Sequence, residues 1–152
     1  MDVSKYKSLY LQETGEHISG IEAGLLSLER APGDSSVLDN LFRHYHSIKG
    51  MSASMGYTPI MQLSHAQEDL LDKLRSGKLT ATEAMTSTLL KCLDAMKELV
   101  ERVRADEPLD IDSSSLMEAL KAEAEGRQAS APPILTTPAA PQPQQVAEQG
   151  LK

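Results

Sequence analysis

The chain lacks several residue types on which whole classes of protein depend. It has no tryptophan, one phenylalanine and one cysteine among its 152 residues. So few aromatic residues, beside abundant Leu, Met and Ala, disfavour a β-sandwich and indicate an all-α fold. The single cysteine, Cys92, cannot form an intramolecular disulfide, and its leucine-rich surroundings predict a buried and inert thiol.

Long apolar runs and clusters of positive charge are missing as well. No segment approaches the roughly 20 apolar residues of a membrane span, and the first residues do not resemble a signal peptide. We therefore expect a cytoplasmic protein without direct membrane insertion. The formal net charge is -7, and no run of Lys and Arg suits a phosphate backbone, so we exclude nucleic acid as a partner and expect proteins instead.

What the sequence does contain is helical periodicity. Apolar residues recur at three- and four-residue steps and predict helices over about residues 3–29, 35–55, 59–76 and 81–105, with a short fifth helix over 114–124. The residues of each helix that recur in this way form a stripe expected to face the core. The stripe of the first helix consists of Tyr6, Leu9, Tyr10, Glu13, His17, Ile21, Leu25 and Leu28. Because the connections are short, the chain should fold as an antiparallel, up-down four-helix bundle with the fifth helix docked against it.

Local signals mark the helix ends. The expected caps are Asp34 and Gly56 for the second helix, Thr58 before Pro59 for the third, and the capping boxes Thr80 with Glu83 and Ser115 with Glu118 for the fourth and fifth. From Gly126 onward Ala, Gln and Pro dominate. Such a composition has too little apolar content to fold, so we predict one domain over residues 1–125 and a flexible linker or disordered terminus over 126–152.

Polar residues at the edges of two helices are not explained by a plain bundle. His46 falls just off the stripe of the second helix, where it stays accessible to solvent, and Lys49 lies one turn further. Glu68 falls just off the stripe of the third helix, with His65 one turn before it. The two helices turn back around Tyr57, which is eleven residues after His46 and eleven before Glu68. Measured along the axes of the two antiparallel helices, His46 and Glu68 should therefore lie at the same height, and Lys49 should be level with His65.

This arrangement suits phosphoryl transfer through an imidazole nitrogen. A carboxylate at one ring N–H, here that of Glu68, selects the tautomer, leaves the other nitrogen able to attack and stabilises the cationic ring that forms. An ammonium group, here that of Lys49, offsets the charge of the arriving phosphoryl group, with His65 as a secondary donor. No glycine-rich loop or P-loop could bind ATP, so the phosphoryl group must come from elsewhere.

Other interpretations of these residues remain open. A histidine on a helix surface is most often ordinary, and Glu68 and Lys49 taken singly would be solvated charges, so only the common height strengthens their case. A helical adaptor that binds partner helices is one alternative. A metal-binding bundle is another, although no Glu-x-x-His or His-x-x-x-His spacing joins His46 and His65 to carboxylates.

The residues around His46 also carry a family resemblance. The segment HSIKGMSASMGY, residues 46–57, resembles the phosphorylation motif of the CheA family of chemotaxis histidine kinases. Residues 4–17 and 63–75 resemble other parts of the N-terminal histidine-phosphotransfer (HPt) domain of these kinases. The resemblance covers roughly residues 1–125.

The resemblance implies a role for each of these four residues on the facing edges of the second and third helices, which we call the groove. His46 would be the phosphoacceptor, Glu68 the hydrogen-bonding carboxylate, and Lys49 and His65 the neighbours of the phosphoryl group. The phosphoryl group would come from ATP, used with Mg by the kinase domain of the same or a partner subunit. It would then pass to an aspartate of a response regulator such as CheY or CheB, in two-component signalling in the cytoplasm, including receptor-associated signalling complexes.

The chain by itself would then bind no cofactor and would not be an enzyme, because the catalytic ATP-binding domain is not part of it. We interpret it either as a fragment of such a kinase or as a free-standing phosphorelay protein, and the proline-rich tail favours a fragment. Two residues depart from the family pattern. His44 stands where the family usually has a small residue, and Gln67 stands where it tends to be apolar. We expect His44 at the surface and His17 in the core, both outside the groove.

Overall fold

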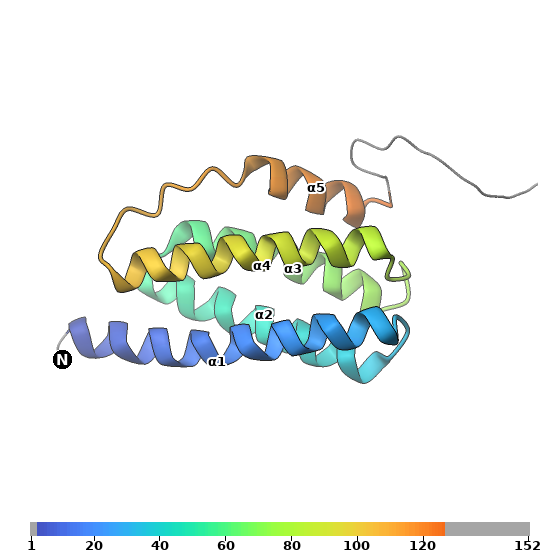
Figure 1. Cartoon of the computed structure of the whole chain (residues 1–152), viewed down its shortest axis with the longest axis horizontal. Helices are drawn as coiled ribbons and strands as arrows, with labels where there is room; N and C mark the ends of the chain where they lie inside the picture. Colours follow the sequence, from blue (N-terminus) through green and yellow to red (C-terminus); the bar gives the residue numbers. More distant parts are fainter. Residues whose placement is uncertain (1–2, 127–152) are drawn as a thin grey trace, which may run out of the picture.

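The computed structural model describes residues 3–126, and these form five helices (Figure 1). Their bounds are α1 Val3–Arg30, α2 Ser35–Met55, α3 Thr58–Arg75, α4 Glu83–Arg104 and α5 Ser114–Ala124. No strand occurs within the described residues. Of the linker predicted over 126–152, all but Gly126 lies outside the described residues.

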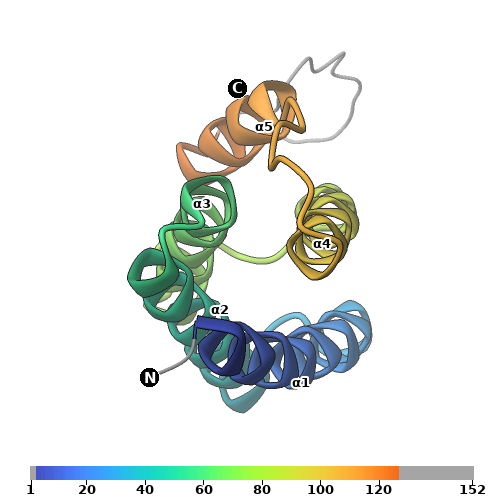
Figure 2. The same cartoon turned by 90° about the vertical axis from the view of Figure 1, so that its left-hand side faces the viewer.

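The helices α1 to α4 form an antiparallel bundle, and α5 packs on its outside. Each of these helices contacts the next one in the chain. The last of the four, α4, also contacts α1, and this contact closes the bundle. Viewed along the bundle, α5 lies over α3 and α4, on the side away from α1 and α2 (Figure 2). The predicted all-α bundle with a docked fifth helix is confirmed.

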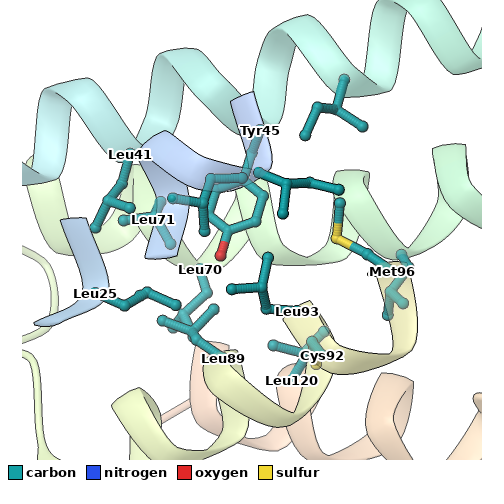
Figure 3. Close-up of a cluster of buried hydrophobic side chains, with 14 of the residues drawn as sticks. Leu25, Leu41, Tyr45, Leu70, Leu71, Leu89, Cys92, Leu93, Met96 and Leu120 are labelled. Carbon is teal, nitrogen blue, oxygen red and sulfur yellow. The ribbon is translucent and has the colours of Figure 1, made fainter. Parts of the chain in front are cut away.

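Leucines from all the helices fill the space between them. Leu25, Leu41, Leu71 and Leu93 are almost fully buried around Tyr45, whose hydroxyl points inward between the helices (Figure 3). Burying side chains of this size contributes about 1.5–3 kcal/mol each relative to leaving them exposed. Cys92 lies in the same core, and burial raises the pKa of its thiol to about 12, so the thiol stays protonated and inert, as predicted.

The predicted apolar face of α1 is partly wrong. Tyr6 and Leu9 are 46% and 52% exposed, and Glu13 is exposed as well. The buried residues of α1 are Tyr10, Thr14, Ile18, Ile21, Leu25 and Leu28. At about 100° per residue this face is centred well to one side of Leu9 and Glu13. The Tyr10 hydroxyl lies 2.8 Å from that of Ser52, close to the end of α2, so the first turn of α1 has little of α2 beside it.

The ends of α2 agree with the prediction, whereas three other predicted caps are wrong. Asp34 accepts hydrogen bonds from the backbone N–H groups of Ser36 and Val37, and Gly56 ends α2 in the left-handed conformation with φ of 77°. The fourth helix was predicted from residue 81, but α4 begins at Glu83, where the Thr82 hydroxyl and not Thr80 accepts from the backbone N–H of Met85. Both threonines are good caps, so local preference alone does not choose between them.

At the start of α3, Thr58 is itself helical and Tyr57 is the N-cap, without a side-chain hydrogen bond. At the start of α5, Ser115 is already inside the helix and Ser113 is the N-cap. There the Asp112 carboxylate accepts the hydrogen bond from the backbone N–H of Ser114. A carboxylate just before the helix thus replaces the expected capping box.

The polar side chain of Gln67 is buried among apolar neighbours. Its amide donates to the backbone oxygen of Leu63 at 3.0 Å and lies 2.9 Å from the sulfur of Met96. A backbone carbonyl of the same helix therefore accepts a hydrogen bond from the Gln67 amide group. This hydrogen bond lets Gln67 occupy a core-facing position where an apolar residue is expected.

Candidate functional site

His46 lies on the outer side of α2, facing the neighbouring helix α3. Its side chain is 62% exposed, and its Nδ1 lies 2.5 Å from Oε2 of Glu68. The short turn after α2 brings the two helices back together, and their closeness follows from this connection. The structure thus joins the two residues that the sequence placed at one height.

Glu68 is the buried member of the site, with a side chain only 7% exposed. Its second oxygen, Oε1, lies 2.6 Å from Nζ of Lys49, so each carboxylate oxygen has a partner of its own. Burial alone would raise the pKa of Glu68, but the hydrogen bonds from Lys49 and His46 and the positive charge of Lys49 outweigh burial and hold this pKa below its usual value. Glu68 is therefore ionised at neutral pH.

The charge on Glu68 decides the tautomer of His46. An ionised carboxylate can only accept hydrogen bonds, so Nδ1 of His46 must be the donor. In the neutral ring the lone pair then lies on Nε2. The site consequently offers a nucleophilic nitrogen on an exposed ring whose other nitrogen is anchored in the protein.

Lys49 and His65 each pair with a carboxylate on α3. Nζ of Lys49 is drawn to Glu68, which its long, half-buried side chain can reach. His65 is 55% exposed, and its Nε2 pairs with Oδ1 of Asp69 one turn further along α3, at 3.7 Å. The structure therefore brings together His46, Glu68 and Lys49, and it places His65 beside Asp69.

The structure also shows two neighbours of His46 that the sequence analysis did not single out. The ring of Phe42 stacks on that of His46, with centroids 6.0 Å apart and planes inclined by 15°. The guanidinium carbon of Arg75, at the end of α3, lies 3.8 Å from the centre of the Phe42 ring. Phe42 stands four residues before His46, a spacing that puts side chains together on a helix, so this neighbour could have been found from the sequence. No comparable signal indicated Arg75.

The prediction that His44 faces solvent is wrong. His44 is half-buried, and its Nδ1 lies 3.0 Å from Nδ1 of His17, which is half-buried and not in the core. A Cβ added to Gly20 on α1 would lie only 2.5 Å from Nε2 of His44. The missing side chain of Gly20 thus makes the room into which the His44 ring turns.

Over residues 3–126, no group of three or more His, Cys, Asp and Glu side chains is arranged to hold a metal ion. Within that same range, none of the helices has the length and apolar character needed to cross a membrane.

Comparisons with known proteins agree with this geometry. The model of the Hpt domain family matches residues 5–106. The chemotaxis protein CheA of Bacillus subtilis is 35% identical over 103 residues, which cover 68% of this chain and 15% of that protein. The chain thus spans less than a fifth of the length of this relative.

Two solved structures resemble the chain. The CheA phosphotransferase domain from Thermotoga maritima has a TM-score of 0.65 and 27% identity, over 68% of this chain and 98% of that one. The phosphorylated P1 domain of CheA3 from R. sphaeroides, solved in complex with CheY6, shares the fold with a TM-score of 0.72 and 22% identity, over 80% of this chain and 97% of that one. With a family model that matches most of the described residues and a bundle like that of CheA phosphotransfer domains, the chain belongs to the Hpt domain family.

Proposed function

We propose that this domain is the phosphoacceptor and phosphocarrier of a CheA-type chemotaxis histidine kinase, with His46 as the residue that carries the phosphoryl group. The observation that supports this most strongly is the contact between Nδ1 of the exposed His46 and the buried, ionised carboxylate of Glu68. It leaves the lone pair on Nε2, the nitrogen that would attack.

In the proposed first step, Nε2 of His46 attacks the γ-phosphorus of ATP, which is held with magnesium by a separate kinase domain. The N–P bond forms while the bond to the bridging oxygen breaks, and ADP leaves. Because the proton stays on Nδ1, the ring becomes cationic, and the carboxylate of Glu68 stabilises it through the existing hydrogen bond. In the second step, a carboxylate oxygen of an aspartate on a response regulator attacks the phosphorus, the N–P bond breaks and His46 returns to its neutral form.

Lys49 and His65 would assist this chemistry in different ways. Lys49 keeps Glu68 ionised and pairs with one of its carboxylate oxygens, Oε1, so that the other oxygen, Oε2, is left for His46. Its positive charge also lies close enough to the site to offset part of the charge of the phosphoryl group. His65 is exposed on the same helix as Glu68, one turn before it, and is proposed as a secondary donor to the phosphoryl oxygens.

The surroundings of His46 favour protein partners. Gly50, one turn after His46, is exposed, and a Cβ added there would meet no atom within 4 Å, so the packing of the described residues gives no reason for a glycine. Close approach of a partner backbone would supply one. The complex of a related P1 domain with CheY6 supports a response regulator as one partner, and the kinase domain would be the other. Such signalling takes place in the cytoplasm.

A kinase-dependent labelling experiment tests this proposal. Incubation of the protein with radiolabelled ATP alone should give no label, and addition of a CheA-type kinase domain should give an acid-labile phosphate on His46. His46→Gln should abolish the label. The matched control is His44→Gln, which removes a histidine two residues away and should keep the label. Label retained in His46→Gln, or found on His44, would contradict the proposal.

A further inference from the structure

The Phe42 ring restricts His46 in a way that Glu68 cannot. The hydrogen bond between Nδ1 and Glu68 constrains mainly the distance between the two atoms, so the two side-chain torsions of His46 can still change together and tilt the plane of the ring. The Phe42 ring lies nearly parallel to the imidazole, with an inclination of 15° and a centroid separation of 6.0 Å, within the range of offset aromatic stacking. The stack opposes this tilt.

The plane of the imidazole matters for phosphoryl transfer because the lone pair of Nε2 lies in it. The attacking nitrogen, the phosphorus and the leaving oxygen must be roughly in line. Holding a nucleophile in the attacking orientation lowers the barrier because less orientational freedom has to be lost in the reaction. A tilted ring would point its lone pair away from the phosphorus, even with the bond to Glu68 intact.

Phe42 is itself held in place from α3. The guanidinium of Arg75 lies 3.8 Å from the centre of the Phe42 ring, which is the geometry of a cation–π contact. Two carboxylates hold the guanidinium, with Nε of Arg75 at 3.1 Å from Asp72 and a terminal nitrogen at 3.6 Å from Asp39. Asp39 belongs to α2 and Asp72 to α3, so this cluster joins the same two helices that carry His46 and Glu68.

We propose that Phe42 is a positioning residue for phosphoryl transfer, which sets the plane of the His46 ring, and that Arg75 acts through Phe42 by holding its ring. This proposal rests on the proposed function of His46. Because the proposal gives neither residue a contact with the phosphoryl group, the effect should appear in the rate of transfer within the complex and not in the affinity for the kinase domain.

The test compares kcat and KM for phosphorylation of the protein by a CheA-type kinase domain. Phe42→Leu keeps an apolar side chain but removes the aromatic plane, and we expect kcat to fall about threefold to tenfold with little change in KM. Phe42→Tyr retains the plane and should restore kcat. Arg75→Gln should lower kcat by a smaller factor, and it should add little in the double variant with Phe42→Leu, because its effect passes through the same ring.

Arg104→Gln is the matched control for Arg75→Gln. Arg104 also stands at a helix end and pairs with a carboxylate three residues earlier, that of Glu101, but it lies on α4. It should leave both kcat and KM unchanged. An unchanged kcat in Phe42→Leu, or a change confined to KM, would overturn the proposal.

A second measurement separates this proposal from the proposed function. The order parameter of the carbon–hydrogen bonds of the His46 ring, measured by NMR without any kinase, should fall in Phe42→Leu and recover in Phe42→Tyr. The ring of the exposed His65 is the internal reference and should not change. If the wild-type protein is not phosphorylated at all, the proposed function fails, and this measurement still decides whether Phe42 positions the ring. An unchanged order parameter would refute the positioning role.

Discussion

Replacement of Glu68 by glutamine probes the central contact of the site with little change of shape. A glutamine has one carbonyl oxygen and one amino group in place of two carboxylate oxygens. It can accept from Nδ1 of His46 or from Nζ of Lys49, but not from both, and its amino group would face one of these donors. Glu68→Gln therefore removes the negative charge and at least one of the two contacts.

The structure allows the size of the effect to be worked out. Hydrogen bonds to charged groups contribute about 1.5–3 kcal/mol, and the bond to Nδ1 becomes fully charge-assisted only when the ring turns cationic. Since each 1.36 kcal/mol is a factor of ten, the rate of phosphorylation should fall about 10-fold to 150-fold. The loss of stability should be smaller, because Lys49 is 26% exposed and its ammonium can turn to water.

The assay is the initial rate of His46 labelling by a CheA-type kinase domain, with thermal unfolding followed by circular dichroism on the same sample. Glu101→Gln is the control, because Glu101 is an exposed carboxylate that pairs with Arg104 on α4. It should leave the labelling rate unchanged. If Glu68→Gln is folded and labelled at the wild-type rate, Glu68 does not stabilise the cationic ring.

Two further predictions concern stability. Burial and the neighbouring His17 lower the pKa of His44 below its ordinary 6.5, so His44 takes up a proton more readily in the unfolded chain than in the folded one. The free energy of unfolding should therefore decrease as the pH falls below about 6.5, until the pH passes the lowered pKa of the folded state. We measure the free energy of unfolding in urea at about pH 7.5 and about pH 5, and the difference between the two values should be smaller for His44→Gln than for the wild type. The control His65→Gln, at an exposed position, should keep the full difference. Equal differences in all three proteins would show that His44 is not the group responsible. Gly56→Ala should destabilise the domain by about 1 kcal/mol in urea unfolding, because φ of 77° strains any residue with a Cβ. The control Gly15→Ala, at an open position inside α1, should instead stabilise it by up to about 1 kcal/mol, and a stabilised Gly56→Ala would contradict the role given to this cap.

Much of the site could be predicted from the sequence because it depends on local geometry. The period of a helix places His46 and Glu68 at the edges of their stripes, and the short turn around Tyr57 sets the register of α2 against α3. Equal distances from the turn then mean equal heights, and the contact between His46 and Glu68 follows. The chemical assignment of His46 itself remains a proposal that the labelling experiment tests.

Other features depended on choices between groups of nearly equal local preference. Thr80 and Thr82 are both suitable caps for α4, and only the path of the chain into the bundle selects Thr82. Lys49 could have reached toward His65 or toward Glu68, and the buried carboxylate attracts it more strongly than an exposed imidazole. A sequence pattern states which residues share a face, but not which of two neighbours a long side chain will reach.

The sequence by itself determined the number and type of the helices, their antiparallel order and the pairing of His46 with Glu68, because each of these follows from a period, a turn or a short connection. Only the tertiary structure decided which side of α1 is covered, that His44 turns into the space left by Gly20, and that Arg75 reaches Phe42 beside His46. These contacts depend on how whole helices are rotated and shifted against each other. That placement results from the packing of the entire core, to which every buried side chain contributes and which no local segment encodes.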